Sequence, residues 1–285
     1  MPRLFCFGLG YSALALADLL RARGFSIAGT VRNAEKAEAL REQGIEAHLL
    51  DRDRPLADFA AALAGADHIL STVPPDAAGD PVLDLHGADL ARLSGISWAG
   101  YLSTTGVYGD KGGGWVDEDT PLAPVSERGA RRVAAEVAWA ATGLPLHIFR
   151  LPGIYGPGRN AIAQLRAGTA RAIVREGQVF SRIHVDDIAG ALAASIAAPR
   201  PGRAYNVCDD EPAPPWEVIE HAADLAHLPR LPRVAFEDAD LGPMARSFWG
   251  ESKRVSNRRL RVELGYALRY PTYRDGLAAL LAEGA

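Results

Sequence analysis

The sequence predicts an α/β protein: a doubly wound parallel sheet with a small C-terminal substrate-binding subdomain. An apolar run at residues 3–7 ends in Gly8-Leu9-Gly10, and a helical pattern begins at once. Strand-like and helix-like stretches then alternate five times before residue 104. This alternation is typical of parallel strands joined by helical crossovers, as in a Rossmann fold.

The glycine turn predicts a dinucleotide site. Gly8 would make the tight turn, and Gly10, which lacks a Cβ, would let a pyrophosphate approach the backbone. Ala13 stands in the third slot, where a small residue lets helix and strand pack closely. The helix N-terminus offers unpaired N–H groups and a partial positive charge to an anion. The expected cofactor contacts here are Gly8, Leu9, Gly10, Tyr11, Ser12 and Ala13.

The second strand predicts which dinucleotide binds. It runs from Phe25 to Val31, and an NAD site usually carries an acidic residue at its end for the ribose 2′-hydroxyl. Here Arg32 follows instead, and its guanidinium can fork onto a 2′-phosphate. We therefore expect NADP(H), with NAD(H) as the alternative cofactor. The competing interpretation of Arg32 is a solvated arginine at a strand end.

The third and fourth strands end in further candidate contacts. Asp51 could accept a hydrogen bond from the adenine amino group, or it could cap the next turn. The fourth strand leads into Thr72, Val73 and Pro74, and the prolines after it cannot continue a strand or helix. This segment should lie over the carboxyl edge of the sheet, where open α/β sheets bind ligands.

The remaining helices and strands are predicted from the periodicity of apolar residues and from the glycine and proline residues that end each element. In the first half we expect a helix from Ala13 to about Gly24, a helix at 34–43, a strand at 45–50, a helix at 56–64, a strand at 67–72, a helix at 80–94 and a strand at 98–103. In the second half we expect a helix at 126–142, a strand at 146–151, a helix at 160–167, a hairpin-like piece at 174–182, a helix ending at Ala198, a strand at 204–208, a helix at 215–227 and a last helix near the C-terminus. The predicted division is a dinucleotide-binding core at 1–152, its sheet completed by about 180–208, and a mainly substrate-binding part at 153–285.

Composition narrows the class of protein. The 285 residues allow one large domain or two closely associated ones, and 48% hydrophobic residues supply a sizeable core. The net charge of −4 argues against nucleic acid as a partner. Cys6 and Cys208 lie far apart in strand-like runs and are expected to be reduced. No apolar run approaches the roughly 20 residues that span a bilayer, and the N-terminal run is too short for a signal peptide, so we expect a cytoplasmic protein without a membrane partner.

His184-Val185-Asp186-Asp187 is the one stretch that suggests a metal site. Neither a third ligand nor a tight Cys/His spacing supports it, so we predict no metal and an aspartate that caps the following helix.

Several motifs, in order along the chain, carry a family resemblance. They are Ser103-Thr104-Thr105-Gly106-Val107-Tyr108-Gly109, Asp117-Glu118-Asp119-Thr120-Pro121, Arg150-Leu151-Pro152-Gly153-Ile154-Tyr155-Gly156, Ile183-His184-Val185-Asp186-Asp187 and Tyr205-Asn206-Val207. With the glycine turn, they resemble the extended short-chain dehydrogenase/reductases, the group that holds nucleotide-sugar epimerases and dehydratases. The GxGxxA form of the turn is similar to the atypical branch of that group.

The resemblance implies roles for residues of the second half. Thr104 would orient the substrate oxygen. Ser103, at the same strand end, would contact the cofactor. Arg132, at the position of the family's lysine, would bond the ribose hydroxyls. Pro152 would lie against the nicotinamide carboxamide.

The chain departs from the family at its general acid/base. Arg128 stands where the family has a tyrosine, and a guanidinium keeps its proton at neutral pH. No tyrosine occurs between residues 109 and 154. The resemblance brings Tyr108, Lys111 and Tyr155 near the nicotinamide as replacements. The alternatives are that both tyrosines pack beside the ligand and that Lys111 is a solvated loop residue.

Two functions therefore stay open. The first is an NADP(H)-binding oxidoreductase or epimerase/dehydratase-like enzyme that acts on a small molecule, with Thr104, Tyr108 and Tyr155 as catalytic candidates. The second is a catalytically silent NADP(H)-binding or redox-sensing protein. The resemblance also implies a homodimer through the helices at 80–94 and 126–142.

Overall fold

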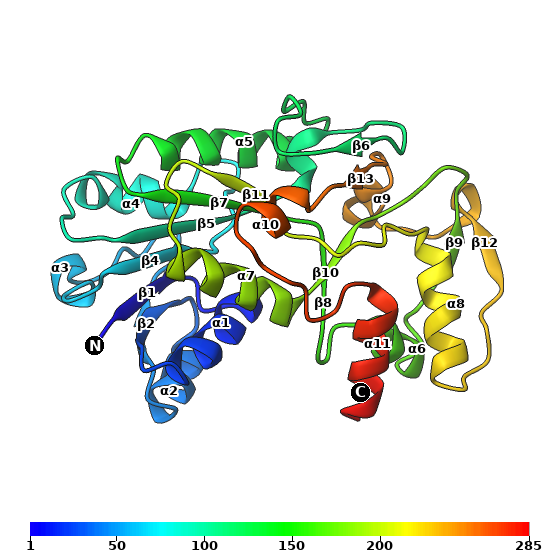
Figure 1. Ribbon diagram of the computed structural model, residues 1–285, viewed down its shortest axis with the longest axis horizontal. Helices are drawn as coiled ribbons and strands as arrows, with labels where there is room; N and C mark the ends of the chain where they lie inside the picture. Colours follow the sequence, from blue (N-terminus) through cyan, green and yellow to red (C-terminus); the bar gives the residue numbers. More distant parts are fainter. Residues whose placement is uncertain (285) are drawn as a thin grey trace. The chain divides into compact units, whose positions relative to one another are not determined.

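The structure is a computed structural model that describes residues 1–284 (Figure 1). The chain forms two compact units that interleave along the sequence. The first unit contains Met1–Thr104, Ala130–Arg150 and Ile188–Tyr205, and the second contains Thr105–Gly129, Leu151–Asp187 and Asn206–Ala285.

A seven-stranded sheet forms the centre of the first unit, in the order β11-β7-β5-β4-β1-β2-β3. β1 pairs in parallel with β2 and β4, β2 with β3, and β4 with β5. From β1 the chain order runs outward through β2 to β3 on one side and through β4 and β5 to β7 and β11 on the other. This is the order of a doubly wound sheet, so the predicted Rossmann fold is confirmed. The strands are β1 (Arg3–Phe7), β2 (Ser26–Val31), β3 (Glu46–Leu49), β4 (His68–Ser71), β5 (Trp98–Thr104), β7 (Leu146–Leu151) and β11 (Ala204–Asn206).

Helices connect these strands, and their apolar stripes face the sheet. In the first helix, Ala13, Leu16, Ala17 and Leu20 are buried, as their spacing predicts. The helices are α1 (Tyr11–Arg21), α2 (Ala34–Glu42), α3 (Phe59–Ala62), α4 (Pro81–Leu90), α5 (Glu127–Ala140) and α7 (Val185–Ala197).

The helix predicted at residues 56–64 is wrong in length, since only Phe59–Ala62 are helical. Asp58 caps the helix by accepting a hydrogen bond from the Ala61 amide at 2.9 Å. Leu56 precedes the cap and is buried in the hydrophobic core. Burial of this leucine in an extended segment outweighs the helical preference of the alanines around it.

A glutamate–arginine ion pair is buried in the first unit. Glu136 on α5 and Arg150 on β7 are 4% and 6% exposed. Arg150 donates from Nη2 to Oε2 of Glu136 at 2.8 Å and from Nε to Oε1 at 3.2 Å. Ser103 donates its hydroxyl to the same Oε1 at 2.5 Å. The carboxylate is therefore fully engaged, which is the condition for keeping such a pair inside a core.

The second unit consists of short elements around smaller cores. They are η1 (Thr105–Tyr108), β6 (Trp115–Val116), β8 (Gly153–Tyr155), α6 (Ala161–Arg166), β9 (Ala172–Val174), β10 (Arg182–His184), α8 (Pro215–Leu225), β12 (Arg233–Ala235), η2 (Phe236–Asp238), α9 (Pro243–Phe248), β13 (Arg254–Val255), α10 (Arg258–Val262) and α11 (Tyr273–Ala282).

The hairpin predicted at 174–182 is wrong. β9 pairs in parallel with β12, and β10 pairs in parallel with β8. Each strand has three residues, and strands so short carry too few side chains to specify a partner locally. Distant segments therefore supply the pairing. Within the part of the chain that the structure describes, no helix has both the length and the apolar character needed to cross a membrane.

Candidate functional site

The turns that follow β1 to β4 lie at one edge of the sheet, because these strands are parallel (Figure 1). This edge gathers most of the residues that the sequence predicts as cofactor contacts. They are the glycine turn after β1, Arg32 after β2, Asp51 after β3 and Thr72–Pro74 after β4.

The glycine turn requires its first glycine. Gly8 has φ +91°, and a Cβ there would lie 2.7 Å from Oγ1 of Thr72 and 3.2 Å from Cγ2 of Val73. Thr72 donates its hydroxyl to the Gly8 carbonyl at 2.6 Å, and the Gly8 amide donates to Oγ1 of Thr30 at 2.9 Å. The turn is thus fastened to both neighbouring strands, and a side chain would break this packing.

The second glycine faces open space instead. A Cβ at Gly10 would meet no atom within 4 Å. Gly10 is also the N-cap of α1, where no side chain caps the helix and the first turn holds no acidic residue. Ala13 is fully buried behind it. An uncapped helix of this length next to open backbone is a favourable position for a phosphate group.

Three cationic side chains surround the end of β2. Arg32 is exposed there. Arg54 donates from Nη2 to the Arg32 carbonyl at 2.8 Å, and Lys36 donates from Nζ to the Leu9 carbonyl in the glycine turn at 2.8 Å. Sequence reasoning found Arg32 and missed the other two. The signal for Lys36 was its place in the first turn of α2, next to the strand end.

Asp51 takes part in a turn. Its carboxylate pairs with Arg54 at 2.5 Å and accepts the Asp53 amide at 3.1 Å. These contacts agree with the turn-capping alternative that the sequence left open. A contact between Asp51 and adenine stays a prediction.

The predicted cofactor contacts Ser103 and Arg132 form hydrogen bonds within the first unit. The Ser103 hydroxyl is bonded to Glu136, as described above. Arg132 is 9% exposed and donates from Nη1 to the Leu102 carbonyl at 2.6 Å and to the Tyr101 hydroxyl at 3.0 Å. Thr104, at the end of β5, is half-buried. Their roles toward cofactor or substrate stay predictions.

The tyrosine candidates lie in the second unit. The Tyr108 hydroxyl donates to Oδ1 of Asn206 at 2.8 Å, and Tyr108 is fully buried. The Tyr155 hydroxyl donates to the Thr272 carbonyl at 3.5 Å, and burial raises the pKa of this phenol well above its usual value. Both contacts are those of packed tyrosines, the alternative that the sequence left open.

Other predicted positions of the second unit lie on its loops and helix start. The Lys111 backbone amide donates to the Ser252 carbonyl at 3.1 Å, which holds the glycine-rich loop to the segment before β13. Pro152 directly follows β7. Arg128 lies over the ring of Phe248, with 5.0 Å between its Cζ and the ring centroid.

The His184–Asp187 stretch packs as a structural element. Asp187 accepts hydrogen bonds from the Tyr266 hydroxyl at 2.8 Å, the Arg269 amide at 2.6 Å and the Tyr270 amide at 3.1 Å. Burial lowers the pKa of His184 to about 4. Across residues 1–284, no group of three or more His, Cys, Asp or Glu side chains is arranged to hold a metal ion.

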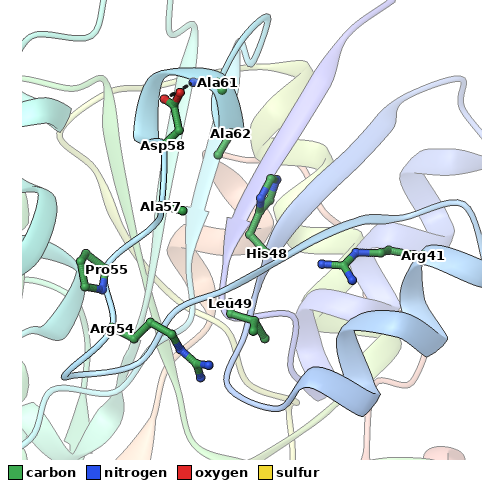
Figure 2. A pocket seen from close by; sticks show the side chains of 9 residues that line it. All are labelled: Arg41, His48, Leu49, Arg54, Pro55, Ala57, Asp58, Ala61 and Ala62. Atoms are coloured by element: carbon green, nitrogen blue, oxygen red, sulfur yellow. Dashed lines mark hydrogen bonds between the residues drawn. The ribbon is translucent and has the colours of Figure 1, made fainter.

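A cavity of about 410 Å³ lies beside β3, the edge strand of the sheet, and shares Arg54 with the cationic end of β2 (Figure 2). Apolar side chains line most of it, together with Arg41, His48, Arg54 and Asp58. Arg41 donates from Nη2 and Nε to the Ala47 carbonyl at 2.6 and 3.1 Å. The Arg41 side chain thus covers part of the unpaired edge of β3, and covering such an edge is a common protection against pairing with another chain.

Known proteins resemble this chain along nearly its whole length. Protein YeeZ of Escherichia coli strain K12 is 31% identical over 286 residues, which cover 95% of this chain and 97% of that protein. The 3-diazoavenalumate denitrifying reductase of a Streptomyces species is 30% identical and covers 92% of this chain and 94% of its own. The structure of a conserved protein of unknown function from Silicibacter pomeroyi has 52% identity and a TM-score of 0.91, with 99% of each chain covered.

Two more distant structures share the fold and contain a cofactor. The human epimerase family protein SDR39U1 with NADPH has a TM-score of 0.75 at 19% identity, with 100% of each chain covered. The UDP-glucuronic acid 4-epimerase of Bacillus cereus in complex with NAD has a TM-score of 0.76 at 16% identity, with 99% of each chain covered.

A profile of the NAD dependent epimerase/dehydratase family matches residues 8–208, from the glycine turn to the end of the Tyr205-Asn206-Val207 motif. This match spans more than half of the chain and agrees with the doubly wound sheet and with the relatives of similar length. The chain is therefore a member of the NAD-dependent epimerase/dehydratase family.

Proposed function

We propose that this protein binds NADP(H) at the carboxyl edge of its sheet and acts as an oxidoreductase or epimerase/dehydratase-like enzyme on a small molecule. The observation that carries the proposal is the cationic end of β2 beside an uncapped glycine turn. The chain's family membership and its 30% identity to a Streptomyces reductase support the binding of a nicotinamide dinucleotide.

The residues fit the two phosphate-bearing parts of such a cofactor, the pyrophosphate and the 2′-phosphate. Gly10 leaves room for a pyrophosphate at the start of α1, where the N–H groups of the first helical turn point outward. Arg32 and Arg54 supply guanidinium groups where a 2′-phosphate would follow the adenine ribose. An acidic side chain, which would select a free 2′-hydroxyl, does not occupy residue 32 or 33.

The bound nicotinamide would supply hydride transfer, and this chain's residues would bind and orient both partners. Thr104 is the candidate to hold the substrate oxygen, since it ends β5 and is half-buried. Both candidate phenols donate to protein acceptors, and the raised pKa of Tyr155 disfavours its ionisation.

These same contacts favour a second candidate function, a protein that binds NADP(H) without catalysis. Arg128, at the position of the family's tyrosine, lies over Phe248 and cannot give up a proton at neutral pH. In this case the cofactor would act as the sensed ligand.

The first experiment is an equilibrium titration with NADPH and NADH, followed by quenching of the five tryptophans. Tight NADPH binding and weaker NADH binding are expected. Gly10→Ala is the matched control, because its methyl group meets no protein atom within 4 Å but occupies the space for the pyrophosphate. It should fold normally and lose affinity for both cofactors.

Binding of neither cofactor by the wild-type protein would contradict the proposal. Equal affinities for NADPH and NADH would contradict the choice of NADP(H). Turnover of NADPH in a screen of small carbonyl compounds would favour the enzyme over the silent binder.

A further inference from the structure

The turn that follows β3 carries two arginines that point to different neighbours. Its sequence is Asp51-Arg52-Asp53-Arg54. Arg54 reaches back to the carbonyl at the end of β2, as described above. Arg52 reaches the other way, to the loop that follows β4.

The loop at residues 72–80 is fixed at both of its ends. At its start, Thr72 is hydrogen-bonded to the glycine turn at 2.6 Å. At its end, Asp80 caps α4 and accepts a hydrogen bond from Nε1 of the buried Trp139 at 2.9 Å. Val73, next to the first anchor, packs against the hydrophobic core. The rest of the loop up to Asp80 contains two prolines, Asp76, two alanines and Gly79, and none of these is a large apolar side chain that could anchor it in the core.

Arg52 holds the middle of this loop. Its guanidinium donates to both carboxylate oxygens of Asp76, at 2.8 and 2.6 Å, and to the Gly79 carbonyl at 2.9 Å. It also forms an ion pair with Asp84 on α4. The hydrogen bonds from Arg52 lower the pKa of Asp76 below its usual value, so the pair stays charged at neutral pH.

We infer that Arg52 is a positioning residue for the cofactor: with Asp76 and Asp84 it clasps the loop at 72–80 to the turn after β3 and so slows cofactor release. This inference rests on the proposed binding of a nicotinamide dinucleotide. The clasp connects two loops at the ligand-binding edge of the sheet, so opening it would free the loop that adjoins the glycine turn. Arg52 itself need not touch the cofactor.

The arrangement makes this role separable from a role in folding. The side chains of Arg52, Asp76 and Asp84 are 28%, 45% and 43% exposed. Ion pairs this exposed contribute little to global stability. A loop whose ends are fixed independently can loosen in its middle without unfolding the sheet.

The test compares Arg52→Met with the wild-type protein in a stopped-flow displacement of bound NADPH, and again of bound NADH. The expected result is a release rate that rises about 3- to 10-fold, by the same factor for both cofactors, with little change in melting temperature. The same factor is expected because the clasp lies between loops and does not read the 2′-phosphate. Arg52→Lys should restore part of the slow release, since one ammonium can still pair with a carboxylate.

Arg3→Met is the matched control. Arg3 also joins two segments of the first unit, through an ion pair with Glu46 at 2.7 Å and a hydrogen bond to the Ala62 carbonyl at 3.3 Å. It begins β1, at the amino edge of the sheet, away from the glycine turn. Cofactor release from this variant should match that of the wild type.

The outcomes are distinct. If the wild-type protein binds neither cofactor, the proposed function is refuted, and so is the role of Arg52 in cofactor release. If the wild type binds but Arg52→Met releases cofactor no faster than Arg3→Met, the clasp is refuted and the proposed function stands. If Arg52→Met does not fold, Asp76→Asn combined with Asp84→Asn removes both negative charges that pair with Arg52 and must also accelerate cofactor release.

Discussion

Removing the positive charge after β2 should convert a protein that prefers NADPH into one that does not discriminate. Arg32 is the residue at the strand end, and Arg54 donates to its carbonyl at 2.8 Å. A charge-assisted hydrogen bond to phosphate is worth about 1.5–3 kcal/mol when well formed. Because Arg32 is exposed, we expect about 1–2 kcal/mol, or roughly a 5- to 30-fold loss of NADPH affinity in Arg32→Ala.

Arg54→Ala should cost at least as much, for a different reason. Arg54 pairs with Asp51 at 2.5 Å. Its removal leaves that carboxylate uncompensated beside the position proposed for the 2′-phosphate, so repulsion adds to the lost attraction. Asp51→Asn in the Arg54→Ala background should recover part of the affinity.

The assay is a titration of each variant with NADPH and NADH at about 0.15 M salt, where exposed charges still interact over a Debye length of about 8 Å. NADH affinity should stay within about twofold of wild type, because NADH has no group for these arginines. An unchanged NADPH/NADH preference in the double variant Arg32→Ala, Arg54→Ala would refute the assignment of this edge to a 2′-phosphate.

Two further predictions concern buried charge. Glu136→Ala should destabilise the protein by about 3–5 kcal/mol in chemical denaturation, because it leaves the buried Arg150 guanidinium without its carboxylate. Asp209 is a buried carboxyl group whose pKa is raised to about 8 by desolvation, opposed by the charge of Arg182. A folded-state pKa above the unfolded value favours folding at low pH, so stability should fall as the pH rises from about 4 to about 8, by on the order of a few kcal/mol in total. Asp209→Asn should flatten this dependence when urea unfolding is compared at pH 5 and pH 8.

Each of these two predictions has its own control. Glu38→Ala removes an exposed partner of Arg41 and should change stability by less than about 0.5 kcal/mol. A loss in Glu136→Ala as small as that in Glu38→Ala would contradict the burial argument. For Asp209, an unchanged pH dependence in the asparagine variant would assign the effect to other groups.

The fold could be predicted because its signals are local. A glycine turn after an apolar strand, repeated strand–helix alternation, and glycine or proline at element ends each act within about ten residues. The first strand and helix show this directly, since Ala13, Leu16, Ala17 and Leu20 are buried at their predicted spacing. The same local logic brought the ends of β1 to β4 to one edge, because parallel strands must end on the same side.

The candidate site was only partly predictable, because many of its hydrogen bonds join residues that are far apart in the sequence. Arg32 follows from its place after a strand, but the Arg32 carbonyl that Arg54 reaches and the carboxylates that Arg52 reaches lie 22 to 32 residues away and have no spacing signature. The partners of Tyr108 and Tyr155 lie 98 and 117 residues away. A sequence pattern shows which residue types are available, and it does not show which acceptor a hydroxyl or guanidinium will meet.

The sequence by itself thus determined the sheet and the position of its glycine turn, since helix and strand periodicity are set by the backbone of each segment. Tertiary structure alone decided the pairing of the three-residue strands β9 and β10, the shortening of α3, and the grouping of Arg32, Lys36 and Arg54 around the end of β2. In each case the deciding contacts join segments that are far apart in the sequence, so the periodicity within one segment does not report them.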